Sequence, residues 1–254
     1  MSSDLFIVPF LTGLGFAILL PVLGCYLRLR DEWLAALAYA NVAAAGALLA
    51  MLGGWAPVLG GLLAAGLAGA GRHLFARRLS GGAGDALLLL GAWAGAILLA
   101  ANAPMAERLG HALFDGQLYF ADSEQLWSVA IGGLVAMIVL RALSSRLLLA
   151  RVYPDLFRLR RLPAWPIHVG FDLMVALCLA LATMSLGVMG AFALVFIPPW
   201  LAFRRAKNWR NGLAWALGIA VLAYVVAFVA ALGLDQPFGP VLALLLVLAG
   251  LLVA

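Results

Sequence analysis

The sequence predicts an all-α, polytopic membrane protein with eight or nine transmembrane helices, and three observations support this fold class. Hydrophobic residues make up 66% of the 254 residues, charged residues make up only 11%, and the mean hydropathy is +1.11. The apolar residues form continuous stretches of about 20, the length at which a helix crosses a bilayer. Basic residues collect between these stretches. Soluble domains carry about a quarter charged residues, so soluble enzymes, nucleic-acid-binding proteins and disordered proteins are excluded.

The apolar stretches follow one another as a single transmembrane domain over residues 1–254. Their continuity indicates helices, because membrane strands show short alternating segments instead. The seventh and ninth stretches are short, and the seventh contains Pro198-Pro199, so the region 187–203 is expected to be broken or re-entrant. The expected spans are 6–27, 33–53, 55–71, 86–103, 126–145, 167–187, 189–203, 212–232 and 238–254.

The basic residues between the spans predict the orientation, because cytoplasmic loops carry an excess of Lys and Arg. In a nine-span arrangement, fifteen of the sixteen basic residues fall on one side of the membrane, and Arg108 alone lies on the other. The opposite side is acidic. We therefore expect the N-terminus outside and the C-terminus in the cytoplasm.

The external stretch 104–125 is too long to be a simple connector and is expected to form a short surface helix followed by a turn. Within it, Glu107, His111 and Asp115 follow one another at intervals of four residues. A helix would place all three side chains on one face. This face would be either a cation-collecting surface or a set of charge pairs on an ordinary surface helix.

The cytoplasmic stretch 146–166 contains a short basic segment that begins at Tyr153-Pro154-Asp155. Proline and aspartate are favoured in the first turn of a helix. The segment would bind anionic lipid headgroups or dock a cytoplasmic subunit, and the residues favour these two interpretations equally.

The sequence does not predict an enzyme or a resident cofactor. The single lysine, Lys207, is followed by Asn208, so a phosphate-binding loop ending in Gly-Lys-Ser/Thr is excluded. HExxH, CxxC and GxSxG patterns are also absent from the sequence. Asp172 follows His168 by four residues, so the two share a helical face. They form either a metal or proton site, or Asp172 is a first-turn residue near the inner interface, close to water.

Four motifs, in this order, resemble the permease subunits of the ABC-3 family of bacterial metal importers. The resemblance extends over nearly the whole chain. It implies a homodimer in the bacterial inner membrane, driven by a separate ATP-binding cassette subunit and supplied by an extracytoplasmic substrate-binding protein. The cargo would be zinc, iron or manganese. The motifs are ALFDGQLYFADSEQLW at 112–127, Tyr153-Pro154-Asp155-Leu156, Met189-Gly190-Ala191 leading to Pro198, and Asp235-Gln236-Pro237-Phe238-Gly239-Pro240.

The second span departs from the family pattern. Members of the family carry an Asp and, four residues later, a His as metal ligands there, and the resemblance aligns these positions with Ala35 and Tyr39. Tyr39 and Asn41 are therefore the residues expected in the substrate pathway. Neither binds a bare divalent metal as tightly as a carboxylate with an imidazole does.

The resemblance assigns contact with the ATPase to Tyr153, Asp155 and Arg158. The first hypothesis is thus the permease subunit of an ABC importer that moves a metal ion across the inner membrane. The alternatives are a divergent permease of the same fold that moves a metal chelate or another small solute, an ATP-independent secondary transporter, and a purely structural membrane subunit.

Overall fold

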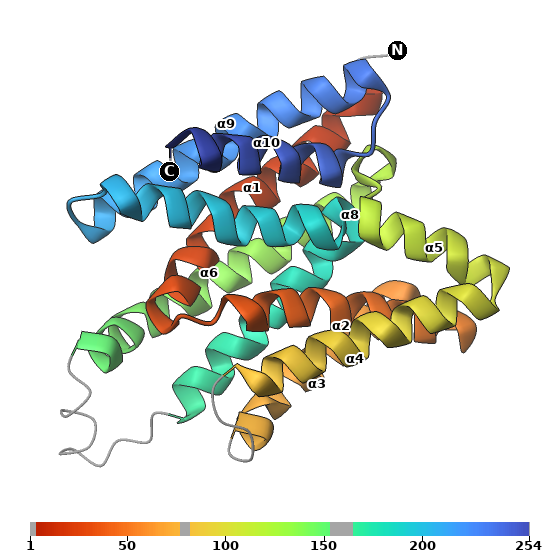
Figure 1. Ribbon diagram of the computed structural model, residues 1–254, viewed down its shortest axis with the longest axis horizontal. Coiled ribbons are helices and arrows are strands. Elements are labelled where there is room, and N and C mark those ends of the chain that lie inside the picture. The colour runs from red at the N-terminus through yellow and green to blue at the C-terminus, as the bar shows by residue number, and fades with distance from the viewer. Residues whose placement is uncertain (1–3, 77–81, 153–164, 254) are drawn as a thin grey trace.

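The computed structural model describes residues 4–76, 82–152 and 165–253, and these ranges contain nine α-helices and one 3₁₀ helix (Figure 1). In chain order the elements are α1 (Asp4–Arg30), α2 (Trp33–Leu52), α3 (Pro57–Ala76), α4 (Ala83–Asn102), α5 (Pro104–Asp115), η1 (Leu118–Phe120), α6 (Ser123–Val152), α8 (Trp165–Arg205), α9 (Trp209–Leu234) and α10 (Phe238–Val253).

The predicted fold class, an all-α polytopic bundle, is confirmed. Six of the described helices are long and apolar enough to cross a membrane, and α8, with 41 residues, covers two of the expected spans. The stretch 104–125 forms α5 and η1, in agreement with the expected short helix; its external position remains a prediction. The residues expected to contact the ATPase, Tyr153, Asp155 and Arg158, lie outside the described ranges.

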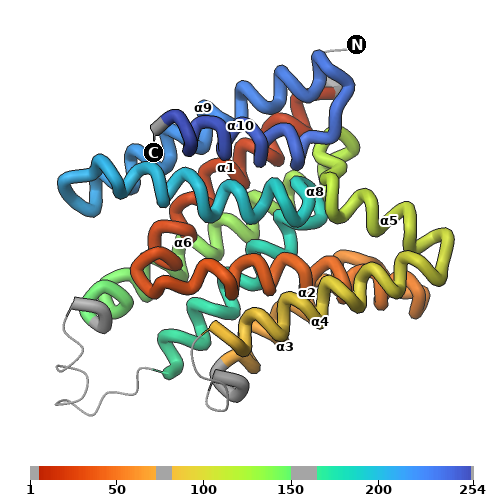
Figure 2. Tube along the Cα trace, viewed as in Figure 1, coloured from red at the N-terminus to blue at the C-terminus, as the bar shows by residue number. Residues whose placement is uncertain are grey.

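Helix α8 consists of two limbs that meet at Gly187 beside the end of α5 (Figure 2). The prediction located a break within 187–203, and the break lies at its first residue rather than at Pro198-Pro199. Both prolines lie within the second limb, although each lacks the N–H that would bond to residue i−4. Arg28 of α1 supports this stretch, since its Nη1 donates to the carbonyls of Pro199 and Trp200 at 3.2 and 3.3 Å.

Glycines allow three elements to touch backbone to backbone around this kink. Gly187 has φ 77° and ψ 165°, a combination that glycine alone adopts readily. A Cβ atom on Gly187 would lie 2.7 Å from the backbone nitrogen of Gly116 and from the carbonyl oxygen of Phe114. A Cβ on Gly239 would lie 2.6 Å from the carbonyl oxygen of Asp115. The end of α5, the kink of α8 and the start of α10 are thereby joined.

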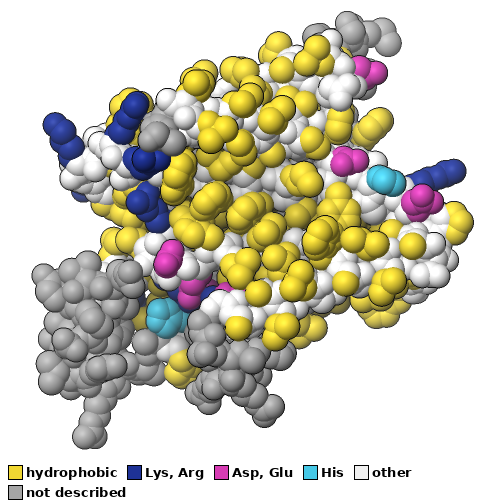
Figure 3. Space-filling view, in the orientation of Figure 1, with side chains coloured by type: hydrophobic (Ala, Val, Ile, Leu, Met, Phe, Trp, Pro, Cys, Tyr) yellow, Lys and Arg dark blue, Asp and Glu magenta, His cyan; other side chains and the backbone are white. Residues whose placement is uncertain are grey.

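The two ends of the bundle differ in charge (Figure 3). We name the end at the turn between α8 and α9, where Arg204, Arg205, Lys207 and Arg210 are exposed, the basic end. The other end carries α5 and the kink of α8, and is named the acidic end. The cytoplasmic position of the basic end remains a prediction.

Replacing Gly187 by alanine tests the kink. Gly187→Ala is expected to cost about 1–3 kcal/mol because the alanine must adopt a strained backbone conformation, and the new Cβ must also displace the end of α5. Thermal unfolding of the purified protein, followed by tryptophan fluorescence, should show a drop of several degrees.

The matched control is Gly218→Ala in α9, where a Cβ would meet no atom within 4 Å. Alanine is the better helix former, so this variant should keep or raise the unfolding temperature. An unchanged unfolding temperature for Gly187→Ala would contradict the role given to the kink.

Candidate functional site

The structure places the two residues expected in the substrate pathway on different surfaces of α2. Tyr39 is 1% exposed and, like Ala35, faces the interior of the bundle. Asn41 lines a groove, and its Nδ2 donates to the carbonyl of Leu37 one turn earlier at 2.9 Å. Residues two apart point to opposite sides of a helix. The structure therefore does not bring Tyr39 and Asn41 together, and the pair at i, i+4 in the groove is Leu37 and Asn41.

The groove beside Asn41 has a volume of about 490 Å³. Its walls come from α2, α4, α10 and the first ten residues of the second limb of α8, and α5 contributes one residue. The aromatic side chains in these walls are Trp93, Phe114, Phe192 and Phe196. Asn41 supplies the amide among the apolar and aromatic residues that line it. We call it the Asn41 groove.

A cluster of five charges ties four helices together at the basic end, and Arg72 lies at its centre. The guanidinium of Arg72 forms a bidentate pair with Asp85 at the start of α4, with both Nε–Oδ1 and Nη2–Oδ2 at 2.8 Å. Arg72 Nη1 also lies 3.0 Å from Glu32 Oε2 and 3.4 Å from Asp172 Oδ2. A planar guanidinium with several donors suits this bridging role.

Arg30 at the end of α1 completes this ionic cluster. Its Nη1 lies 2.7 Å from Asp172 Oδ1, and its Nε lies 2.7 Å from Glu32 Oε2. The guanidinium also stacks over the ring of Phe171, 5.2 Å from its centroid. The side chain of Asp172 is only 2% exposed, so its charge depends on these two arginines.

Among the ion pairs of the described residues, two arginines face three carboxylates in the ionic cluster. Burial raises the pKa of the Glu32 carboxyl, and the guanidinium groups of Arg30 and Arg72 act against this shift. A proton on Glu32 would remove one of these three negative charges. Tyr39 lies within electrostatic range of Asp172, Arg72 and Asp85, and its hydroxyl has no hydrogen-bond partner among the described residues.

Sequence reasoning missed most of this cluster. Arg30 and Arg72 were interpreted as loop charges that report orientation, although each has a partner at least 100 residues away. Asp172 was expected either in a metal or proton site with His168 or in a first turn near water. The first-turn interpretation is wrong, because Asp172 lies two turns into α8, buried against arginines; the site with His168 remains a prediction. The sequence signal that could have predicted the cluster is the presence of charged residues of both signs beside the ends of several expected spans.

The residues expected to collect cations lie on α5, where Glu107 and His111 are exposed and Asp115 is half-buried. They share a surface helix, as expected. Within residues 4–76, 82–152 and 165–253, no group of three His, Cys, Asp or Glu side chains is placed to hold a metal ion. The structure therefore does not join the three into a common site.

The fold and its apolar helices define a multi-pass membrane protein. The family model of the ABC 3 transport family matches residues 3–254, and the chain belongs to this family. A search of curated proteins gave no match.

Two solved structures resemble the chain. One is PsaBC from Streptococcus pneumoniae in complex with Fab, with a TM-score of 0.83 and 16% identity over 100% of this chain and 95% of the other. The second is described as a metal-chelate type ABC transporter in an inward-facing conformation, with a TM-score of 0.64 and 19% identity over 96% of this chain and 82% of the other. At such identities these similarities show a shared fold.

Charge balance in the ionic cluster can be tested by removing Arg72. Arg72→Gln leaves Asp85 without its bidentate partner and makes the cluster more negative by one charge, which is expected to cost about 3–5 kcal/mol. The double variant Arg72→Gln, Asp85→Asn restores the original net charge and should unfold at a higher temperature than the single variant.

Thermal unfolding in the same detergent measures both variants, with Arg108→Gln on the exposed surface of α5 as the control that should not change. Equal unfolding temperatures for the single and double variants would show that the cluster does not depend on its charge balance.

Proposed function

We propose that this chain is the membrane-spanning subunit of an ABC importer and that it carries a metal within a small chelate through the Asn41 groove. Family membership supports the ABC transport class. The chemistry of the groove supports the cargo, and it is the observation on which this proposal depends.

A bare divalent cation needs carboxylate, imidazole or thiolate ligands to replace its water. The Asn41 groove instead offers aromatic faces, aliphatic side chains, the thioether of Met189 and one amide, and a lone thioether is a soft ligand that does not suit these divalent ions. Small-molecule sites of this composition bury the organic surface of a ligand and orient it through few polar groups. A chelated metal presents such an organic shell, whereas a bare zinc, iron or manganese ion does not.

The ionic cluster would close the pathway at the basic end, which we place on the cytoplasmic side of a bacterial inner membrane. Asp172 on the first limb of α8 pairs with Arg30 on α1 and Arg72 on α3. Opening toward the basic end requires these helices to separate, so the pairs must break. Separating buried charges costs several kcal/mol, which suits a transporter driven by an external ATPase.

The partners follow from this assignment. Two copies of the chain would work with two cytoplasmic ATP-binding cassette subunits, and an extracytoplasmic binding protein would deliver the cargo at the acidic end. Contact with the ATPase would involve Tyr153, Asp155 and Arg158.

Transport by the complete complex in liposomes tests the cargo. Zinc, iron and manganese, each supplied as the free ion and as the citrate complex, would be followed as radioactive isotopes. We expect ATP-driven uptake of a citrate complex to exceed uptake of the free ion. Asn41→Leu should lower uptake at least several-fold, because it removes the amide of the groove.

Asn102→Leu is the matched control. Its Nδ2 also donates to a carbonyl one turn earlier, that of Leu98 at 2.7 Å, but Asn102 is exposed at the end of α4. Uptake of free metal without any need for the chelator would make the bare ion the cargo. Uptake that survives ATP depletion and collapses with a proton ionophore would indicate a secondary transporter.

Association with the ATPase can be tested separately. Asp155→Ala and Arg158→Ala should weaken co-purification of an ATP-binding cassette subunit with the tagged permease by several-fold, since each removes a charged group from the proposed contact. Arg141→Ala, on the exposed surface of α6, should leave the yield unchanged. Stoichiometric complexes with both variants would contradict the docking assignment.

A further inference from the structure

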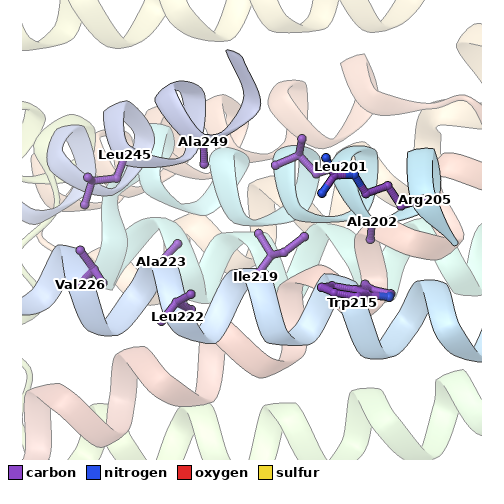
Figure 4. Close-up of a pocket in the computed structure, with 10 residues that line it drawn as sticks. All are labelled: Leu201, Ala202, Arg205, Trp215, Ile219, Leu222, Ala223, Val226, Leu245 and Ala249. Atoms are coloured by element: carbon purple, nitrogen blue, oxygen red, sulfur yellow. The ribbon is translucent and has the colours of Figure 1, made fainter. Parts of the chain in front are cut away.

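A second groove runs along the outside of the bundle between the second limb of α8, α9 and α10 (Figure 4). It has a volume of about 360 Å³ and lies apart from the Asn41 groove, with no lining residue in common. Its floor is hollow because small side chains line it, Ala202 on α8, Ala223 on α9 and Ala249 on α10. We call it the Arg205 groove.

The length of the Arg205 groove matches one leaflet of a bilayer. Along α9 its lining residues extend from Trp215 to Val226, which is about 16 Å at 1.5 Å per residue. The hydrocarbon core of a bilayer is about 30 Å thick, so the groove covers half of it. Leu222 and Val226 are 67% and 46% exposed, and give the groove an apolar wall at this depth.

One end of the groove is charged, and it lies at the basic end of the bundle. Figure 4 shows the side chain of Arg205 at the same end as Trp215, with Val226 and Leu245 at the other. Trp215 is 52% exposed, as tryptophan commonly is at the interface between lipid tails and headgroups. Arg204, Lys207 and Arg210 are exposed nearby on the same turn.

We propose that the Arg205 groove binds a phospholipid with an anionic headgroup, with one acyl chain between α8, α9 and α10 and the headgroup phosphate at Arg205. Guanidinium groups bind phosphate oxygens through two parallel hydrogen bonds, and basic residues at the membrane surface attract anionic lipids. A neutral lipid satisfies the apolar part of the groove but not the charge at its mouth. If a second copy of this chain packed against the groove, its four exposed cations at the same turn would face those of the first copy and repel them. An anionic lipid has the complementary charge, so charge favours the lipid as the occupant.

Native mass spectrometry of the purified transporter tests this proposal. The protein would be incubated in detergent with equal amounts of phosphatidylglycerol and phosphatidylcholine that carry the same acyl chains. We expect the wild type to retain phosphatidylglycerol several-fold over phosphatidylcholine. Arg205→Gln should bring the ratio close to one, while Arg141→Gln, an exposed arginine on α6, should not change it.

The acyl-chain part of the groove is tested by filling it. Ala249→Leu and Ala223→Leu should each lower retention of both lipids, whereas Ala214→Leu, exposed on α9 outside the groove, should not. Ala249 lies near the end of α10, where a larger side chain disturbs the fold less. Ala249→Leu therefore keeps the test valid if Ala223→Leu does not fold. A phosphatidylglycerol with a diazirine on its chain should label peptides of α9 and α10 in the wild type and lose this labelling in Ala249→Leu.

Three results would overturn the proposal. Equal retention of the two lipids by the wild type would show unselective annular lipid only. An unchanged ratio of the two lipids in Arg205→Gln would show that Arg205 does not bind the headgroup. Cross-links between Cys residues placed at Ala223 of two copies would show that a second chain, rather than a lipid, occupies the groove.

Discussion

Every charge buried among these helices must find its counter-charge within the protein, because a bilayer offers no water to solvate it. Arg30 and Arg72 supply positive charge to Glu32, Asp85 and Asp172 at once. Each of these residues comes from a different helix or from the connection after α1, so satisfying the charges also determines how the helices meet. The relative positions of α1, α3, α4 and α8 at the basic end follow from this single electrostatic constraint.

The acidic end is held by a different interaction. There Gly116, Gly187 and Gly239 let three elements approach through their backbones, and such contacts gain dispersion energy without burying charge. Tyr224 adds a long-range connection, since its hydroxyl donates to the carbonyl of Phe10 at 2.8 Å. Ion pairs can break and form again, whereas a close-packed backbone contact tolerates little displacement. The bundle therefore has one end suited to opening and one suited to serving as a pivot.

Helix positions could be predicted closely from the sequence because lipid thickness requires about 20 apolar residues for each crossing. The break in α8 could not, since Pro198-Pro199 is a strong local signal, whereas Gly187 is one of 28 glycines and its conformation depends on α5 and α10. Asn41 lines a groove, and its place in the substrate pathway remains a prediction. The ionic cluster could not be predicted, because it joins residues up to 142 positions apart and neither a motif nor a periodicity indicates contacts over such a separation.

Helix α8 connects all these features, which makes Gly187 the point at which they are coupled. Its first limb carries Asp172 into the ionic cluster, and its second limb lines both the Asn41 groove and the Arg205 groove. A change in the angle between the limbs would move Asp172 relative to Arg30 and at the same time change the wall opposite Asn41. Because one backbone position joins the limbs, the proposed breaking of the ion pairs and reshaping of the groove would be parts of one movement. A lipid bound between the second limb, α9 and α10 would hold that limb to its neighbours, so the surrounding membrane would influence the same equilibrium.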